Sequence, residues 1–208
     1  MNVFISADIE GVCGVMGPCH WDPAGAEYKR ACGWMTQEVN AAVRGALAAG
    51  AKRIVVKDAH NTATNIPLDE LDPAAELISG WGPLDSMVEG VDSSFGAVFL
   101  IGYHARGGTI DGTLAHTFSS NVLDLRVNGQ TVGEAGWAGM FAGHFDVPVA
   151  LVTGDDKLKA RVEALRILVE ALDRDLQTDA VPRPPRRGPT HPTALQRDAG
   201  GLGARVGE

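Results

Sequence analysis

Three short apolar segments of the chain are each followed by side chains that can bind a metal ion. The first is followed by Asp8 and Glu10, the second by Asp58 and His60, and the third by His104. Carboxylate oxygens and imidazole nitrogens, without a thiolate, suit zinc, manganese or cobalt in a catalytic centre. The pattern therefore predicts a metal site where these segments end.

The spacing of the two acidic residues adds to this hypothesis. Asp8 and Glu10 lie two residues apart, so both side chains point to one face if the strand stays regular. A carboxylate can also bridge two cations about 3.5–4 Å apart, which allows a two-metal site. Each residue has a plainer interpretation. The two acids also suit a solvated loop edge or a helix cap, Asp58 suits a turn, and His104 alone suits a hydrogen-bonded structural histidine. Their shared position at strand ends favours the metal site.

The elements that must position these residues follow from hydrophobic patterning. Segments 3–7, 54–57 and 96–101 are short, continuous apolar runs, as in strands buried on both faces of a parallel sheet. Residues 26–49 carry apolar side chains at helical spacing, and Gly50 follows as a stop. Strand, helix and strand in this order form a right-handed parallel crossover. We therefore expect an α/β fold, a mostly parallel sheet with flanking helices. Ligands bind outside the carboxyl ends of such strands, where the candidate ligands lie.

The later elements are less regular. Asn128-Gly129 is a strong hairpin signal, and Pro148 indicates that a strand over 147–152 lies at a sheet edge. We predict a short strand at 77–80 and a helix of small residues at 133–143. A long amphipathic helix is predicted from Gly154 to about residue 176. We assign Trp81 and Met87 to the core rather than to a pocket or an oligomer interface.

Composition excludes several classes of protein. The 208 residues include 26 acidic and 18 basic ones, a net charge of −8 that disfavours general binding of nucleic acids. Cys13, Cys19 and Cys32 are an odd number and match no zinc-finger spacing, as expected for reduced thiols. The first residues do not resemble a signal peptide, and no apolar run is long enough to span a membrane. We expect a soluble, cytoplasmic protein with no nucleic-acid or membrane partner.

Several stretches occur together in the order typical of one family. They are SADIEGVCGV (6–15), KDAHNTATN (57–65), SMVEG (86–90), LIGYHA (100–105), VGEAG (132–136) and TGDD (153–156). Through them the chain, over about residues 1–156, resembles the D-aminopeptidase family of binuclear zinc peptidases.

The resemblance implies a set of site residues. The metal ligands that it implies are Asp8, which bridges the ions, Glu10, His60, His104 and Glu134, and the catalytic residue is His116 within LAHTF. Taken alone, Glu134 is equally a first-turn acid favoured by the helix dipole. The implied cofactor is two Zn²⁺ per subunit, with Mn²⁺ or Co²⁺ as substitutes.

The implied activity is a metal-dependent aminopeptidase that hydrolyses short peptides with an N-terminal D-amino acid, such as D-Ala-type di- and tripeptides. The implied assembly is a ring-like homo-oligomer, a decamer. Histidine is the side chain most often used for proton transfer in enzymes, which favours an acid–base role for His116 over direct nucleophilic attack. Two alternatives stay open. One is another two-metal hydrolase acting on phosphoesters, which the scarcity of Lys and Arg near the motifs disfavours. The other is a catalytically weak metal-binding or assembly protein.

The hydrophobic pattern ends after Gln177, and residues 181–189 are rich in Pro and Arg. We expect residues 1–178 to form a metallopeptidase-like α/β domain and residues 179–208 to be a disordered tail. Family members look longer than this chain, so we expect the tail to replace a lost continuation, through truncation or a change of reading frame.

Overall fold

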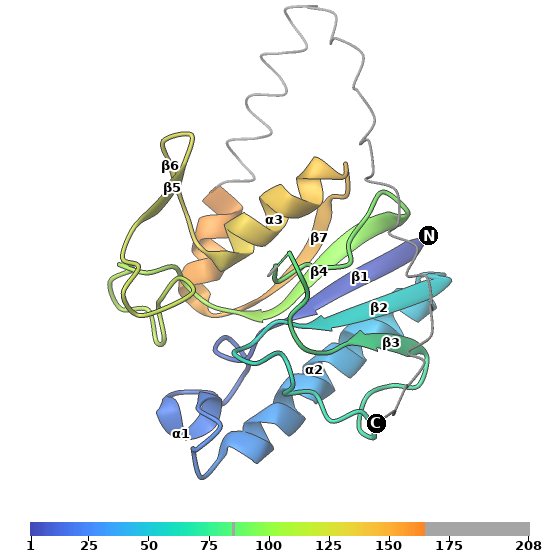
Figure 1. Ribbon diagram of the computed structural model, residues 1–208, viewed down its shortest axis with the longest axis horizontal. Coiled ribbons are helices and arrows are strands. Elements are labelled where there is room, and N and C mark those ends of the chain that lie inside the picture. The colour runs from blue at the N-terminus through green and yellow to red at the C-terminus, as the bar shows by residue number, and fades with distance from the viewer. Residues whose placement is uncertain (85, 165–208) are drawn as a thin grey trace, which may run out of the picture. The chain divides into compact units, whose positions relative to one another are not determined.

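The computed structural model describes residues 1–84 and 86–164. Its centre is a parallel five-stranded sheet in the order β3-β2-β1-β4-β7, drawn in Figure 1. The strands are β1 (Asn2–Ala7), β2 (Arg53–Asp58), β3 (Ala75–Ile78), β4 (Phe95–Tyr103) and β7 (Val149–Gly154). The predicted α/β fold with a mostly parallel sheet is confirmed, and β7 lies at an edge as Pro148 indicated.

Helices flank the sheet, and a small hairpin stands apart from it. The helices are α1 (Pro18–Trp21), α2 (Tyr28–Ala48) and α3 (Glu134–His144), and residues 156–164 are also helical. The hairpin pairs β5 (Leu125–Val127) with β6 (Gln130–Val132). Its turn residues Asn128 and Gly129 have φ angles of 51° and 79°, as a two-residue hairpin turn with both central residues left-handed requires.

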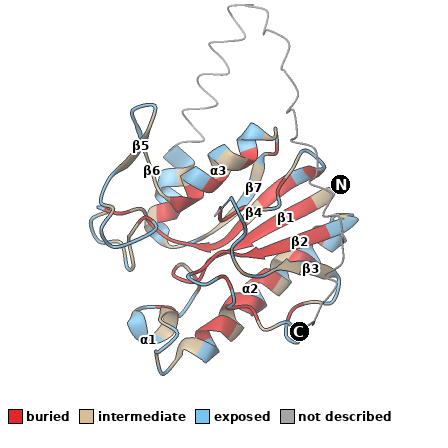
Figure 2. Ribbon diagram, in the orientation of Figure 1, coloured by how far each residue is buried: buried red, intermediate tan, exposed pale blue. Residues whose placement is uncertain are grey.

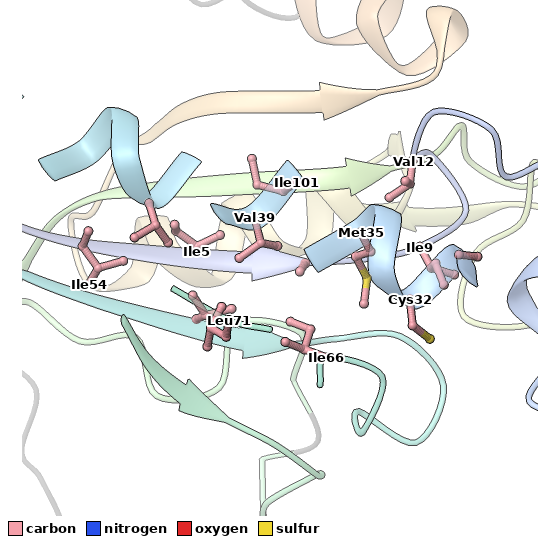
Figure 3. Packing of buried hydrophobic residues seen from close by; sticks show 14 of the residues in the cluster. Ile5, Ile9, Val12, Cys32, Met35, Val39, Ile54, Ile66, Leu71 and Ile101 are labelled. Atoms are coloured by element: carbon pink, nitrogen blue, oxygen red, sulfur yellow. The ribbon is translucent and has the colours of Figure 1, made fainter. Parts of the chain in front are cut away.

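The strands at the centre of the sheet are buried on both faces, as Figure 2 shows. Alternate residues of β1 point to opposite sides, so Ile5 packs with Met35 and Val39 of α2 in the cluster of Figure 3. Phe4 points the other way and belongs to the cluster that contains Ala138 of α3. Two apolar layers therefore fix β1 between the helices, and with it the residues at its carboxyl end.

The far end of the predicted amphipathic helix and the predicted tail over 179–208 lie outside the described residues. Within 1–84 and 86–164, no helix is long and apolar enough to cross a membrane.

Candidate metal centre

The carboxyl ends of β1, β2 and β4 meet at one edge of the sheet, as Figure 1 shows. Asp8 follows β1 directly, His60 lies two residues beyond β2, and His104 follows β4 directly. Glu10 lies in the turn after Asp8, and all four side chains are buried. The sheet therefore brings together four of the six candidate site residues.

A tight turn places the two acids, rather than a continued strand. β1 ends at Ala7, and the backbone N–H of Gly11 donates to the carbonyl of Gly102 at 2.8 Å. A Cβ at Gly11 would lie 1.7 Å from the carbonyl oxygen of Tyr103, so only glycine allows this approach. The same-face argument for Asp8 and Glu10 thus does not apply, because the backbone is not extended beyond Ala7.

Asp8 lies between two histidines. Its Oδ1 is 3.4 Å from His60 Nδ1, and its Oδ2 is 3.4 Å from His104 Nε2. Glu10 Oε2 is 3.0 Å from the same nitrogen of His60. The two oxygens of one carboxylate therefore face two different ring nitrogens.

Glu134 and His116 close the other side of the cluster. Glu134 is the first residue of α3, and its Oε1 lies 3.4 Å from His104 Nε2 and 3.6 Å from His116 Nε2. The His116 ring stacks on His104, with the ring centroids 4.1 Å apart. The His116 side chain is 26% exposed, against 1% for His104. All six candidate site residues thus meet at one place, and His116 is the most open of them.

Each of the three histidines is oriented by a backbone carbonyl. The hydrogen bonds join His60 Nε2 to Trp21 O at 2.9 Å, His104 Nδ1 to Ala105 O at 2.9 Å, and His116 Nδ1 to Leu114 O at 2.8 Å. Because a carbonyl only accepts, the bonded nitrogen carries a hydrogen, so the other nitrogen is the one that can give up its proton and bind a cation. Those other nitrogens face the carboxylates. Metal-binding histidines are oriented by outer hydrogen bonds of this kind.

Two carboxylates outside the cluster hold the loops that carry it. Asp58 accepts hydrogen bonds from the backbone N–H groups of Asn65 and Ile66, which fixes the loop containing His60. Asp155 accepts from Ala105 N at 2.7 Å and from Leu158 N at 2.7 Å. It therefore links the segment after β4 to the start of the helix at residues 156–164. The sequence offered Asp58 as a turn residue, and that interpretation is confirmed.

Two features of the site were missed or assigned wrongly. The four-residue helix α1, which supplies the Trp21 carbonyl, is too short for periodicity to detect, and Pro18 at its first turn was the available signal. Trp81 is 37% exposed and lines the cavity, so its assignment to the core was wrong. Met87 is buried as predicted and also contacts the cavity.

The carboxylates of the cluster favour positive charge on the two buried histidines. Burial lowers the pKa of His60, but contacts with Asp8 and Glu10 outweigh this and raise it to about 11. Burial also lowers the pKa of His104, but Glu134 and Asp8 outweigh this and raise it to about 10. Burial also raises the pKa of Asp8, but His60 and His104 lower it to about 2. Burial and the neighbouring Asp8 charge raise the pKa of Glu10.

A divalent cation fits this arrangement. Asp8 Oδ2, Glu10 Oε2 and His104 Nε2 are buried, and their close contacts within the cluster include no hydrogen bond among the described residues. Buried polar atoms without partners are costly, and a cation between them removes that cost. Ligand atoms of Asp8, Glu10 and His104 lie within 4.8 Å of one another, as do those of His104, His116 and Glu134. Oxygen and nitrogen donors without a thiolate suit zinc.

The cluster opens into a cavity of about 940 Å³. Apart from the candidate site residues, its wall is largely apolar and aromatic. The apolar side chains that line it are Trp21, Ala59, Trp81, Met87, Leu114, Ala115, Phe118 and Trp137. No lysine or arginine lines it in the part of the chain that the structure describes.

A parallel sheet with a cluster of carboxylates and histidines at its carboxyl edge is the architecture of a metal-dependent hydrolase. The model of the D-aminopeptidase family matches residues 1–172, and the chain belongs to that family. It is 34% identical over 183 residues to the D-aminopeptidase of Bacillus subtilis (strain 168), which covers 87% of this chain and 66% of that protein. The solved structure of the Zn-dependent D-aminopeptidase DppA from Bacillus subtilis, described as a self-compartmentalizing protease, aligns with a TM-score of 0.77 and 36% identity. That alignment covers 79% of this chain and 60% of the DppA chain, so the chain spans about two thirds of its relatives.

Proposed function

We propose that the protein is a zinc-dependent aminopeptidase that hydrolyses short peptides with an N-terminal D-amino acid. The observation that carries the proposal is the set of buried atoms of Asp8, Glu10 and His104 that lack hydrogen-bond partners, in a cluster whose Asp8 and Glu10 line the cavity. Membership of the D-aminopeptidase family supports the substrate class.

We propose that the cluster binds two ions per chain. Asp8 directs one oxygen towards His60 and the other towards His104, so it suits the bridging position. Glu10 and His60 would hold one ion with Asp8, and His104 and Glu134 would hold the other. When bound, zinc supplies a Lewis acid for the peptide carbonyl and makes water more acidic; Mn²⁺ or Co²⁺ would act similarly.

We assign proton transfer to His116. Its Nδ1–H is held by the Leu114 carbonyl, so Nε2 is the nitrogen that takes or gives a proton. This nitrogen faces Glu10 at 3.8 Å and Glu134 at 3.6 Å, and the side chain lines the cavity. His116 would accept the proton of the attacking water and deliver it to the leaving amine, as a general base and then a general acid.

The direct test is release of D-alanine from D-Ala-D-Ala by folded, zinc-loaded protein, with L-Ala-L-Ala as the comparison. We expect release from the D-peptide at a higher kcat/KM. No release by protein whose zinc content is verified would contradict the proposal. Hydrolysis of p-nitrophenyl phosphate in the same assay would favour the phosphoesterase alternative. The absence of lysine and arginine from the described cavity wall disfavours that alternative, because phosphate clamps use cations.

We propose that residues 1–178 form the metallopeptidase-like domain and that the chain assembles as a homo-oligomer. The self-compartmentalizing relative supports assembly, and sedimentation velocity would measure it. We also propose a cytoplasmic location, supported by the free thiols of Cys13, Cys19 and Cys32.

A further inference from the structure

Two aromatic side chains stand beside the candidate metal centre and have no part in holding the cation. Phe118 and Trp137 both line the cavity, and they are 50% and 37% exposed. Their rings meet edge to face, with centroids 6.0 Å apart. An exposed aromatic pair on a cavity wall offers apolar area to whatever enters the cavity.

The pair is tied to the metal centre through Glu134. Trp137 lies three residues after Glu134 on α3, so the two side chains share one side of that helix. Phe118 donates its backbone N–H to Glu134 Oε1 at 2.7 Å. Phe118 is therefore positioned by the carboxylate that faces His104 and His116, and Trp137 lies on the same helix as that carboxylate.

Phe118 adopts an unusual backbone conformation. Its φ is 58°, in the left-handed region that bulky residues rarely occupy. Backbone strain of this kind persists where surrounding contacts hold it, and it clusters at functional sites. Here the bond to Glu134 and the contact with Trp137 hold it, so the aromatic ring stays over the cavity although half of it is exposed.

We infer that Phe118 and Trp137 form a subsite for an apolar side chain of the peptide, on a residue next to the scissile bond. This inference rests on the proposed peptidase function and narrows its substrates. A cavity of about 940 Å³ is large for a D-alanyl dipeptide and has room for a bulkier residue. The protein therefore prefers peptides with a residue such as D-leucine beside the scissile bond over the same peptides with alanine or glycine there.

The kinetic test compares three peptides. D-Leu-Gly-Gly against D-Ala-Gly-Gly probes the N-terminal residue, and D-Ala-D-Leu-Gly against D-Ala-Gly-Gly probes the second. We expect kcat/KM for one leucine peptide to exceed that of its partner by at least about tenfold, since even one added methylene in an apolar pocket gives discrimination of that order. In Phe118→Ala and Trp137→Ala the ratio should fall towards one. Met140→Ala is the matched control because Met140 lies on the same helix, is 40% exposed and does not line the cavity; its ratio should stay at the wild-type value.

A binding measurement makes the test independent of turnover. The chain has four tryptophans, so a Trp137→Phe variant identifies the indole N–H signal of Trp137 in a heteronuclear NMR spectrum. In His116→Ala protein, we expect D-Leu-Gly-Gly or D-Ala-D-Leu-Gly to shift that signal more than D-Ala-Gly-Gly does.

The failures of the two proposals are distinguishable. Wild-type protein that cleaves none of the peptides contradicts the peptidase function, and the NMR titration then still decides the subsite. Equal ratios in wild type and variants, or an unmoved Trp137 signal, overturn the subsite. A Trp137→Ala variant that loses assembly and slows equally on all peptides also overturns it, since the pair would then belong to a subunit interface.

Discussion

At the scale of single residues, hydrogen bonds set the chemistry of the three histidines before any metal binds. His116 differs from His60 and His104 because its side chain is 26% exposed, against 6% and 1%. The same ligand type therefore serves two purposes: two buried rings suited to holding a cation and one accessible ring suited to moving a proton.

This difference predicts the behaviour of His116→Ala. The variant should keep the zinc content of the wild type, because Asp8, Glu10, His60, His104 and Glu134 remain. Its kcat on D-Ala-D-Ala should fall by about 10²–10⁴-fold, the usual contribution of a positioned acid–base group. Metal analysis and steady-state kinetics on the same sample measure both quantities. His144→Ala, an exposed histidine at the end of α3, is the control and should change neither. A parallel loss of zinc in His116→Ala would make His116 a ligand instead.

At the scale of elements, the turn after β1 requires glycine at position 11, because there is no room for a side chain. Gly11→Ala would place a methyl group against the Tyr103 carbonyl, so the turn carrying Glu10 or the end of β4 must shift. We expect a loss of roughly 1–3 kcal/mol in the free energy of unfolding, as for other overpacked sites. Gly45→Ala is the matched control, since Gly45 is exposed within α2 and has open space around its Cα. It should stabilise by about 0.5–1 kcal/mol. Urea unfolding measures both, and an unperturbed Gly11→Ala would contradict the close approach.

The elements also show how far the sequence alone could lead. Apolar runs predicted β1, β2 and β4, and the rule for parallel sheets placed Asp8, His60 and His104 at one edge. Pattern alone could not place Glu134 and His116, because their approach depends on the long connection after β4 and on the start of α3; the family resemblance supplied them. Nor could it find the Trp21 carbonyl or the left-handed backbone of Phe118, since both depend on contacts between separate segments of the chain.

At the scale of the whole molecule, binding of a cation at the metal centre and folding of the chain are coupled. The cluster draws on the ends of β1, β2 and β4 and on the first turn of α3, which are separate in the unfolded chain. A cation that binds the folded protein and not the unfolded chain therefore stabilises the entire sheet. The buried atoms of Asp8, Glu10 and His104 that lack partners are the source of that coupling.

Zinc should accordingly raise the melting temperature, and EDTA should reverse the rise. At about 100 times the dissociation constant the gain is about 2.7 kcal/mol, which for a chain of this size is roughly 5–10 °C. Asp8→Asn should remove most of the shift, because Asp8 alone faces both His60 and His104, and an amide lacks the negative charge that holds the ions. Asp111→Asn makes the same chemical change at an exposed loop position and should keep the full shift. Differential scanning calorimetry with and without zinc measures all three proteins, and an equal zinc shift in Asp8→Asn would place the stabilising ion elsewhere in the molecule.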